Sequence, residues 1–361
     1  MPDIKDWGYT GALAGTNTQQ EDLMIARILS AHREQFEVVC EMGFLKARAK
    51  TGEYFRMEES TEFPAVGDFV LIKYNPLGDS LIVRTLPRKS VFSRSDLGGR
   101  KAGHGRVSVE QVIAANFDYV CIVMSLNQNY NARRLERYAA LAWASGAKPL
   151  VVLTKADLTE ERARYLSDAM RLAPGAEVFA LSAVTGEGIG AFRSFFKPGE
   201  TLVFLGSSGV GKSSLVNALM GEEALKVGAV REDDARGRHT TTHRELLMLP
   251  SGAMVIDTPG MRELGILGAD EGLSAAFSDV EELAGRCRFS DCTHRAEPGC
   301  AIQAALKSGR LDRARYESFR ALERENRAAL RRAKEVKLRE KSGTKQQSRP
   351  RDKSYKHATG D

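Results

Sequence analysis

The sequence lacks any long uninterrupted run of apolar residues, although apolar side chains make up 42% of its 361 residues. No stretch approaches the roughly 18–20 residues that a membrane-spanning helix needs. The start, MPDIKDWGYTGALAG, also lacks the basic segment followed by an apolar stretch that marks a secretory signal. No basic amphipathic helix or lipidation signal is present either. We therefore expect a cytoplasmic protein that does not bind membranes.

Cysteine is scarce, and its five residues fall into two groups. Cys40 and Cys121 stand alone in the apolar stretches FEVVCEM and FDYVCIVM, and we interpret them as core residues of strands. The other three lie within fourteen residues of one another. In a reducing cytosol such a cluster indicates metal ligands before disulfides.

Most of the chain has little excess charge of either sign. Residues 331–361 carry 11 Lys and Arg and 4 Asp and Glu, a net charge of +7, whereas the whole chain has +6. The remaining residues therefore sum to −1. A basic block of this kind often contacts nucleic acid, but it can equally be a solvated tail that keeps the protein soluble, and both interpretations stay open.

The first third of the sequence predicts a small β domain. Residues 1–20 are rich in Gly, Thr and Gln and are expected to form a flexible N-terminus. Residues 21–92 then show short β-like runs separated by turn signals, namely LMIARIL, QFEVVCEM, EYFRME, GDFVLIKY and SLIVRTL. Five short strands without a long helix favour a closed barrel such as the OB-fold, the alternative being another small β domain. The Gly-rich basic segment 93–106 is expected to be a linker or mobile loop.

The pattern of apolar and polar residues changes twice along the rest of the chain. Over residues 107–268 apolar runs alternate with helical patterns, which is typical of an α/β domain with a buried parallel sheet. Over residues 269–340 the pattern is helical and is interrupted only by the Cys and His cluster. Residues 341–361 are low in apolar side chains and are expected to form a disordered basic tail.

A phosphate-binding loop stands between the strand-like TLVFL and the helix-like KSSLVNALM. Residues 206–213 read GSSGVGKS, the pattern G-x-x-x-x-G-K-[ST], and this strand–loop–helix setting argues against a chance Gly-rich turn. The glycines let the backbone amides wrap around phosphate, and the helix N-terminus adds partial positive charge. Lys212 is expected to contact the outer phosphates, and Ser213 to bind Mg²⁺.

Two further segments are expected near the γ-phosphate. DTPG at 257–260 follows the apolar run AMVI, so Asp257 can hold Mg²⁺ through water and the Gly260 amide can approach the γ-phosphate. Between it and the phosphate loop lies RGRHTTTHREL, with threonines at 240–242. A threonine hydroxyl there can complete the Mg²⁺ shell only while the γ-phosphate is present, which makes a switch.

Two short segments predict recognition of guanine. TKAD at 154–157 follows the strand-like LVVL, and Asp157 can accept hydrogen bonds from two guanine donors that adenine lacks. The Lys155 stem can lie along the base, and the Ala183 amide of the segment SAVTGEGI can donate to the guanine O6. Each segment alone could be an ordinary strand-to-helix turn, but both follow predicted strands, where α/β ligand sites are built.

These segments occur in an unusual order, because the base-reading pair precedes the phosphate loop. We therefore predict a circularly permuted GTPase domain, an arrangement that is tolerable because domain termini are often close in space. The residues that we assign to GTP are Thr154, Lys155, Ala156, Asp157, Ser182, Ala183, Gly206, Ser207, Ser208, Gly209, Val210, Gly211, Lys212, Ser213, Ser214, Thr240, Thr241, Thr242, Asp257 and Gly260.

A second cluster is suited to zinc. The stretch CRFSDCTHRAEPGC has the spacing C-x₄-C-x-H-x₅-C and supplies Cys287, Cys292, His294 and Cys300. Three thiolates and one imidazole complete a tetrahedral Zn²⁺ shell with no open position, which favours one structural ion over a catalytic one. The alternatives are free cysteines or a disulfide. The surrounding region has little apolar mass, so metal binding would supply much of its folding free energy.

The chain resembles the ribosome small-subunit-dependent GTPase A family of bacteria, RsgA, also called YjeQ or EngC. The resemblance rests on motifs that occur in the order typical of the family, namely TKAD, SA, GSSGVGKSS, GRHTTT, DTPG and the Cys/His cluster. The resemblance covers roughly residues 21–340. It implies an OB-fold, a permuted P-loop GTPase domain and a helical zinc domain. It also implies late maturation of the 30S ribosomal subunit, with contact to 16S rRNA and GTP hydrolysis stimulated by that subunit. We expect a monomer.

The resemblance also bears on two individual positions. The family usually has Asn where this chain has Thr154, whose hydroxyl can replace only part of the Asn contact to the phosphate loop. The residue after DTPG is Met261, which cannot orient water, so another group must do so. The family places a His in the switch segment with that proposed role, and His239 matches it. His243 is a second candidate, and an exposed histidine without a role remains the alternative.

Three functions compete on the sequence alone. The first is a GTPase that turns over as it binds and leaves a large RNA–protein particle. The second is a binding module in which GTP is a bound switch and hydrolysis is incidental. The third is a GTPase that acts on another RNA or on membranes.

Overall fold

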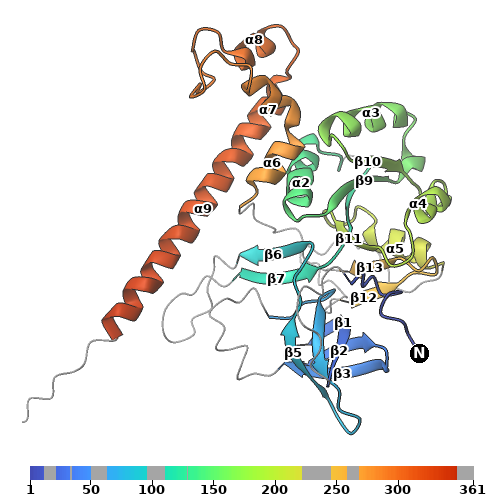
Figure 1. Ribbon diagram of the computed structural model, residues 1–361. Coiled ribbons are helices and arrows are strands. Elements are labelled where there is room, and N and C mark those ends of the chain that lie inside the picture. Colours follow the sequence, from blue (N-terminus) through green and yellow to red (C-terminus); the bar gives the residue numbers. More distant parts are fainter. Residues whose placement is uncertain are drawn as a thin grey trace, which may run out of the picture.

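The computed structural model describes residues 1–11, 22–32, 35–49, 63–95, 110–127, 129–221, 245–257 and 268–347. Along these ranges follow a barrel, an α/β domain and a helical C-terminal region (Figure 1). An extended sheet runs through the first two parts with the strand order β10-β9-β8-β11-β13-β12-β1-β2-β3-β5-β4.

The N-terminal strands close into a five-stranded barrel. Its members are β1 (Leu23–His32), β2 (Gln35–Cys40), β3 (Gly43–Ala49), β4 (Phe69–Lys73) and β5 (Ser80–Thr85). The additional pairing of β1 with β4 closes the ring. Side chains that alternate along the strands fill its interior, among them Ile28, Phe36, Val38, Ile72 and Ile82. The predicted barrel is confirmed.

One strand of this barrel was not predicted. The third strand is Gly43–Ala49, whereas the sequence suggested EYFRME at 53–58, which lies outside the described residues. The segment GFLKARA has modest strand propensity because it combines Gly, Ala and charged residues. It forms a strand because it pairs in register with β2 from Cys40↔Gly43 to Gln35↔Arg48, with Lys46 and Arg48 exposed.

The N-terminal residues 1–11 also depart from the expectation of a flexible segment. Trp7 is 8% exposed and belongs to the largest hydrophobic core. Its ring packs against Phe44 of β3 in an edge-to-face arrangement, with 5.8 Å between the ring centroids. Burial of one indole outweighs the Gly-rich composition that suggested mobility. Residues 12–20 of the predicted segment lie outside the described ranges.

The α/β domain contains the mixed sheet and its covering helices. Its strands are β8 (Tyr119–Ser125), β9 (Lys148–Thr154), β10 (Glu177–Ala180), β11 (Thr201–Leu205), β12 (Glu245–Met248) and β13 (Met254–Asp257). Its helices are α2 (Ala132–Ala144), the 3₁₀ turn η2 (Ala156–Leu158), α3 (Arg162–Leu172), α4 (Ile189–Phe195) and α5 (Lys212–Met220). The strands β10, β9, β8, β11 and β13 are parallel.

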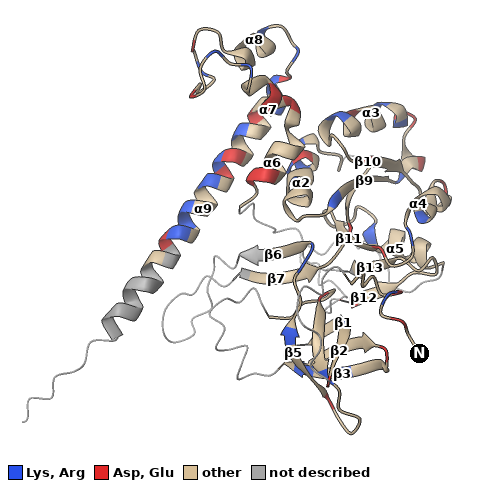
Figure 2. Ribbon diagram, in the orientation of Figure 1, with Lys and Arg blue, Asp and Glu red and all other residues tan. Residues whose placement is uncertain are grey.

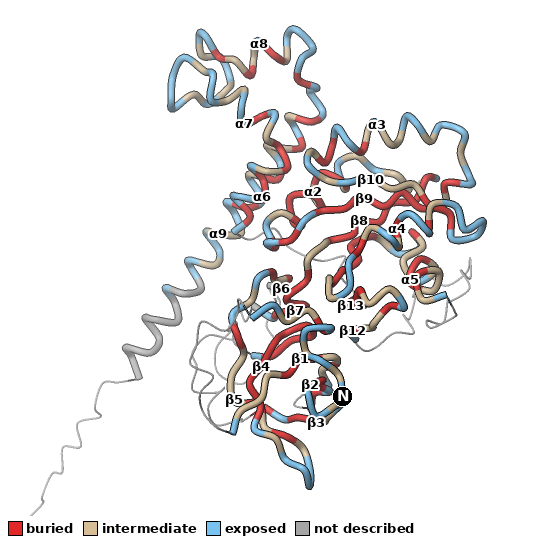
Figure 3. The backbone as a smooth tube through the Cα atoms, turned by 45° about the vertical axis from the view of Figure 1, so that its right-hand side comes forward, coloured by how far each residue is buried: buried red, intermediate tan, exposed pale blue. Residues whose placement is uncertain are grey.

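Alternate residues of the central strands pack into hydrophobic cores on opposite faces of the sheet. On β8, Ile122 and Met124 pack in the core that includes α2, whereas Cys121 and Val123 pack in the core that includes α4 and α5. Figure 3 shows these strands buried between their covering helices. The helices that follow β8 and β11 therefore cover different faces. This divergence makes the carboxyl ends of those two neighbouring strands a site where α/β proteins bind ligands.

A small two-stranded sheet replaces part of the expected linker. Strands β6 (Val91–Ser95) and β7 (Glu110–Ala115) pair antiparallel. Residues 93–95 therefore belong to a strand and not to the linker predicted at 93–106. The sequence did not reveal this strand pair, because the two strands are separated by the Gly-rich segment 96–109. Residues 96–109 lie outside the described ranges.

The barrel and the α/β domain are joined by backbone and by a buried cation. Strand β1 pairs with β12 at Ser30↔Glu245. Arg27 of β1 is 1% exposed, and it donates to the carbonyl of Trp7 and to the Thr201 hydroxyl at 2.9 Å. Burial lowers the pKa of its guanidinium to about 10. A side chain of the barrel thus ends inside the α/β domain.

The C-terminal region is helical and projects away from the barrel (Figure 1). Its helices are α6 (Asp270–Ala276), α7 (Ser278–Ala284), α8 (Ala301–Lys307) and α9 (Arg313–Gln347). Helix α9 continues seven residues, KSGTKQQ, into the tail that we predicted to be disordered from 341. Residues 348–361 lie outside the described ranges. No helix among the described residues is long and apolar enough to cross a membrane.

A buried ionic network fixes α9 to the α/β domain. Arg315 of α9 donates to Glu136 of α2 at 3.0 Å and to both carboxylate oxygens of Asp279 at 2.6 and 2.7 Å. The side chains of Arg315 and Glu136 are 3% and 2% exposed. Burial raises the pKa of Glu136, against the hydrogen bond from Ser318 and the charge of Arg315.

We expect Arg315→Met to destabilise the junction between α2 and α9 by about 3–5 kcal/mol, because it leaves the buried Glu136 without the cation that it pairs with. Calorimetric unfolding and limited proteolysis of the C-terminal region measure the effect. Arg164→Gln is the matched control, since Arg164 pairs with Glu161 only on the surface, with both side chains more than half exposed. Equal unfolding temperatures for the two variants would contradict this role of the network.

Candidate functional site

The phosphate loop connects β11 to α5 at the carboxyl end of the parallel strands. A Cβ added to Gly206 would lie 2.6 Å from the Val123 carbonyl oxygen, so the loop packs directly on β8. Gly209 and Gly211 have φ values of 73° and 95°. Residues with a side chain rarely adopt such angles. Each glycine of the motif therefore has a steric reason to be glycine.

Positive charge and donors converge on this loop. The Lys212 ammonium donates to the carbonyl oxygens of Gly206 at 2.8 Å and Ser207 at 2.7 Å. Ser213 and Ser214 follow in the first turn of α5, where Ser213 is exposed. A lysine, two hydroxyls and the amides of a helix N-terminus together favour an anion at this position.

The predicted base-reading segment lies beside the phosphate loop, although it comes about fifty residues earlier in the chain. The hydroxyl of Thr154 donates to the Val210 carbonyl oxygen at 2.5 Å and lies 3.2 Å from the Met124 carbonyl oxygen. A Cβ added to Gly211 would lie 3.6 Å from the same hydroxyl. The permuted order therefore still brings the two segments into direct contact, and Thr154 makes the expected hydroxyl contact.

The local backbone holds Asp157 out toward solvent. Lys155 has a left-handed φ of 57°, which turns the chain sharply after β9. The Ala156 amide then donates to the Leu181 carbonyl at 3.0 Å, which ties the turn to the end of β10. Asp157 itself is exposed on η2, so its carboxylate is accessible to a ligand.

The second base-reading segment begins where β10 ends. Ser182 is fully buried, and its hydroxyl accepts hydrogen bonds from the Val184 and Thr185 amides at 3.2 Å each. This turn leaves the neighbouring Ala183 exposed. The Ala183 amide makes no hydrogen bond within the described part of the chain, so it remains a donor at the same edge as Asp157.

An ion pair that the sequence analysis did not anticipate joins the two base-reading segments. Arg162 at the start of α3 pairs with Glu187, and its Nη2 also donates to the Ala156 carbonyl at 3.1 Å. Because Arg162 and Glu187 are 25 residues apart, only the tertiary fold brings them together.

The strand that precedes the DTPG segment reaches the same edge. Strand β13 runs parallel to β11 with Val203 opposite Ile256. Asp257 ends β13, so its backbone lies next to the start of the phosphate loop. The structure does not describe the other predicted contacts to the γ-phosphate and to water, which are His239, Thr240, Thr241, Thr242, His243 and Gly260.

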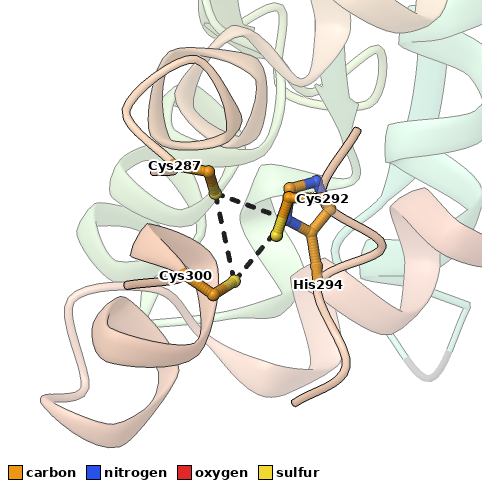
Figure 4. A group of neighbouring side chains, drawn as sticks. All are labelled: Cys287, Cys292, His294 and Cys300. Carbon is orange, nitrogen blue, oxygen red and sulfur yellow. Dashed lines mark hydrogen bonds between the residues drawn. The ribbon is translucent and has the colours of Figure 1, made fainter. Parts of the chain in front are cut away.

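The four predicted metal ligands converge, with all ligand atoms within 4.8 Å of one another (Figure 4). The Cys287 and Cys300 sulfurs are 3.9 Å apart, and the His294 Nδ1 lies 3.5 and 3.6 Å from them. A tetrahedron with Zn–S of about 2.3 Å and Zn–N of about 2.0–2.1 Å would give separations of about 3.8 and 3.6 Å. The donor set therefore fits Zn²⁺, and the sulfurs are too far apart for a disulfide.

Backbone donors shape this cluster. Desolvation raises the pKa of the Cys287 thiol, but hydrogen bonds from the Ala301 and Ile302 amides and from the other two cysteines together lower it below its ordinary value. Between His294 and Cys300, the Glu297 carboxylate accepts from the Thr293 hydroxyl and from nearby backbone amides, which lower its pKa to about 2. These hydrogen bonds thus stabilise the loop that carries the ligands.

A basic side chain near the phosphate loop was also missed. Arg134 lies in the first turn of α2 and donates to the Ser207 hydroxyl at 3.1 Å. A weak sequence signal was available, since NARR at 131–134 follows the apolar strand β8 after a connection of only five residues, 126–130. Nothing in the local pattern, however, indicates that this turn meets a loop 73 residues later.

Comparison with protein families gives a match to the family described as RsgA GTPase over residues 85–267. A second match, to the ABC transporter family over residues 193–343, contains the same phosphate-loop motif, which recurs among P-loop nucleotide-binding proteins. The RsgA 1 protein of Listeria monocytogenes serovar 1/2a, named a small ribosomal subunit biogenesis GTPase, is 47% identical over 83% of this chain and 82% of its own length.

Two solved structures share the fold. YjeQ from Thermotoga maritima superimposes with a TM-score of 0.63 at 26% identity, over 83% of this chain and 97% of its own. YloQ, described as a circularly permuted GTPase, gives a TM-score of 0.59 at 22% identity, over 84% and 95%. The family match, the identity to a relative over most of the chain and the shared fold agree, and the chain belongs to the RsgA GTPase family.

Proposed function

We propose that this chain hydrolyses GTP to GDP and phosphate as it binds and leaves the small ribosomal subunit during the biogenesis of that subunit. The observation that carries the proposal is the hydrogen bond from Thr154 to Val210, which sets the guanine-reading segment against the phosphate loop. The naming of the curated relatives supplies the ribosomal context.

The barrel and the C-terminal helix offer surfaces for 16S rRNA. Figure 2 shows Lys and Arg, interspersed with Asp and Glu, along α9, and Lys and Arg on the barrel strands β3 and β5. Exposed cations favour RNA through the release of counterions. One chain supplies every segment of the nucleotide site, so we propose that a monomer suffices.

The proposal is tested by GTP turnover with and without purified 30S subunits. We expect the subunit to raise kcat, and we expect the increase to shrink as salt weakens rRNA contact. Equal turnover with and without subunits would favour a binding module in which hydrolysis is incidental. Stimulation by an unrelated structured RNA of the same length would favour a GTPase that acts on another RNA.

Guanine selectivity is assigned to Asp157. In Asp157→Asn an amide donor replaces a carboxylate acceptor. GTP affinity should fall by about 100-fold, because a pair of hydrogen bonds to a charged group is lost. Xanthosine triphosphate should bind instead. Competition binding with the two nucleotides measures the exchange. Glu160→Gln, which removes an exposed charge three residues away, is the control. ATP that competes equally with GTP in the parent protein would refute the assignment.

Magnesium and the attacking water are assigned to residues beside the γ-phosphate. We propose that Ser213 and Asp257 hold Mg²⁺ with a threonine of 240–242, and that His239 orients water. His239→Ala should keep GTP affinity but lower single-turnover hydrolysis by about 10²–10⁴-fold, the usual contribution of a general acid–base group. His243→Ala should change little. An unchanged rate of phosphate release in His239→Ala would remove this residue from the mechanism.

One zinc ion is assigned to Cys287, Cys292, His294 and Cys300. We expect about one zinc per chain by elemental analysis, and Cys292→Ser should lose it and open the C-terminal region to protease. Cys40→Ala is the control, because Cys40 is buried in the barrel. Parent protein that is purified without chelators and contains no zinc, yet keeps a protease-resistant C-terminal region, would refute a structural ion.

A further inference from the structure

The first turn of α2 presents an arginine at the carboxyl edge of the sheet. Helix α2 begins after β8, and Asn131 caps it by accepting a hydrogen bond from the Arg134 amide at 2.9 Å. Strand β8 is the direct parallel neighbour of β11, which leads into the phosphate loop. The cap therefore fixes Arg134 at the point where the two chain segments diverge to opposite faces of the sheet.

The guanidinium of Arg134 reaches the phosphate loop. Its Nη1 donates to the Ser207 hydroxyl at 3.1 Å and to the Asn129 side-chain oxygen at 2.9 Å. Both contacts use the same nitrogen. Within the ranges that the structure describes, Nη2 and Nε make no hydrogen bond, so they remain available as donors.

Arg134 differs from its neighbours in having no acidic partner among the described residues. On the same helix Arg133 lies 3.6 Å from Glu317, and Arg137 pairs with Glu325 at 2.5 Å. Both neighbours connect α2 to α9. Arg134 turns toward the phosphate loop instead, and the two contacts of its guanidinium among the described side chains are both to neutral oxygens.

The place of Arg134 along the loop indicates which phosphate it would meet. The carbonyl of Ser207 accepts a hydrogen bond from the Lys212 ammonium at 2.7 Å. In this motif the lysine reaches the β- and γ-phosphates. Since Arg134 contacts the hydroxyl of the same residue, its guanidinium lies at the outer-phosphate end of the loop.

We propose that Arg134 is a further catalytic residue, which contacts the γ-phosphate of GTP and stabilises the charge that develops during hydrolysis. Water attacks the γ-phosphorus, and the bond from that phosphorus to the oxygen bridging to the β-phosphate breaks, which leaves GDP, inorganic phosphate and one released proton. Arg134 keeps its own proton throughout. This inference rests on the proposed GTPase function and adds to it a cation supplied by the chain itself.

The arrangement suits arginine in particular. While Nη1 stays on Asn129, the other guanidinium nitrogens can donate to two phosphate oxygens, a fork that lysine cannot reproduce. A donor held in place before the reaction needs no reorganisation as charge moves onto the phosphate oxygens.

The test compares Arg134→Gln, Arg134→Lys and Arg133→Gln in the full chain with saturating 30S subunits. Arg134→Gln should keep GDP affinity within about threefold, lower single-turnover hydrolysis by about 100-fold and fail to trap GDP with aluminium fluoride, a mimic of the transferring phosphoryl group. Arg134→Lys should recover part of the rate. Arg133→Gln should match the parent in all three measurements.

Three results would overturn the inference. The first is hydrolysis by Arg134→Gln within threefold of the parent. The second is a loss of GTP and GDP affinity with an unchanged rate at saturating GTP, because Arg134 would then contribute only to ground-state binding. The third is a lowered unfolding temperature in Arg134→Gln together with lost GDP binding that Arg134→Lys does not restore. If the parent itself does not hydrolyse GTP, the proposed function fails first, and the two failures are thereby distinguished.

Discussion

The contact between the Thr154 hydroxyl and the Val210 carbonyl is the constraint on which the nucleotide site depends. The chain meets its base-reading segment first and its phosphate loop later, so nothing local holds the two together. The parallel pairing of β9, β8 and β11 brings their carboxyl ends to one edge, and this hydrogen bond fixes the loops against each other there. Guanine specificity and phosphate binding can then act on one nucleotide.

The permuted order also determines what is attached to the nucleotide domain. The strand pair β12 and β13 lies between the two predicted switch segments, and β12 is paired with β1 of the barrel. The C-terminal helices follow the DTPG segment, and α6 packs on α2, where Gly272 allows close approach to the Ala140 carbonyl. Barrel and C-terminal region are thus each connected to elements that adjoin, along the chain, the segments expected to respond to the γ-phosphate.

The sequence predicted well those features that are encoded in contiguous residues. The phosphate loop, TKAD and the Cys/His cluster each carry their chemistry within fourteen residues or fewer, and the alternation of apolar and polar residues predicted most strands. It missed features that arise from distant partners. Arg315 meets Glu136 across 179 residues, Arg27 meets Thr201 across 174, and the strand Gly43–Ala49 has modest propensity of its own. Trp7 lies in a stretch whose glycines suggested mobility. For all of these, tertiary burial decided the outcome.

The central claim is that one guanine nucleotide contacts both the Asp157 segment and the Lys212 loop. Amide hydrogen exchange of the whole chain, with and without GDP, tests it most directly, because each segment reports separately. The account predicts that GDP slows exchange in residues 154–158, 182–187 and 206–215 with the same dependence on GDP concentration. Protection confined to the phosphate loop at saturating GDP would contradict it.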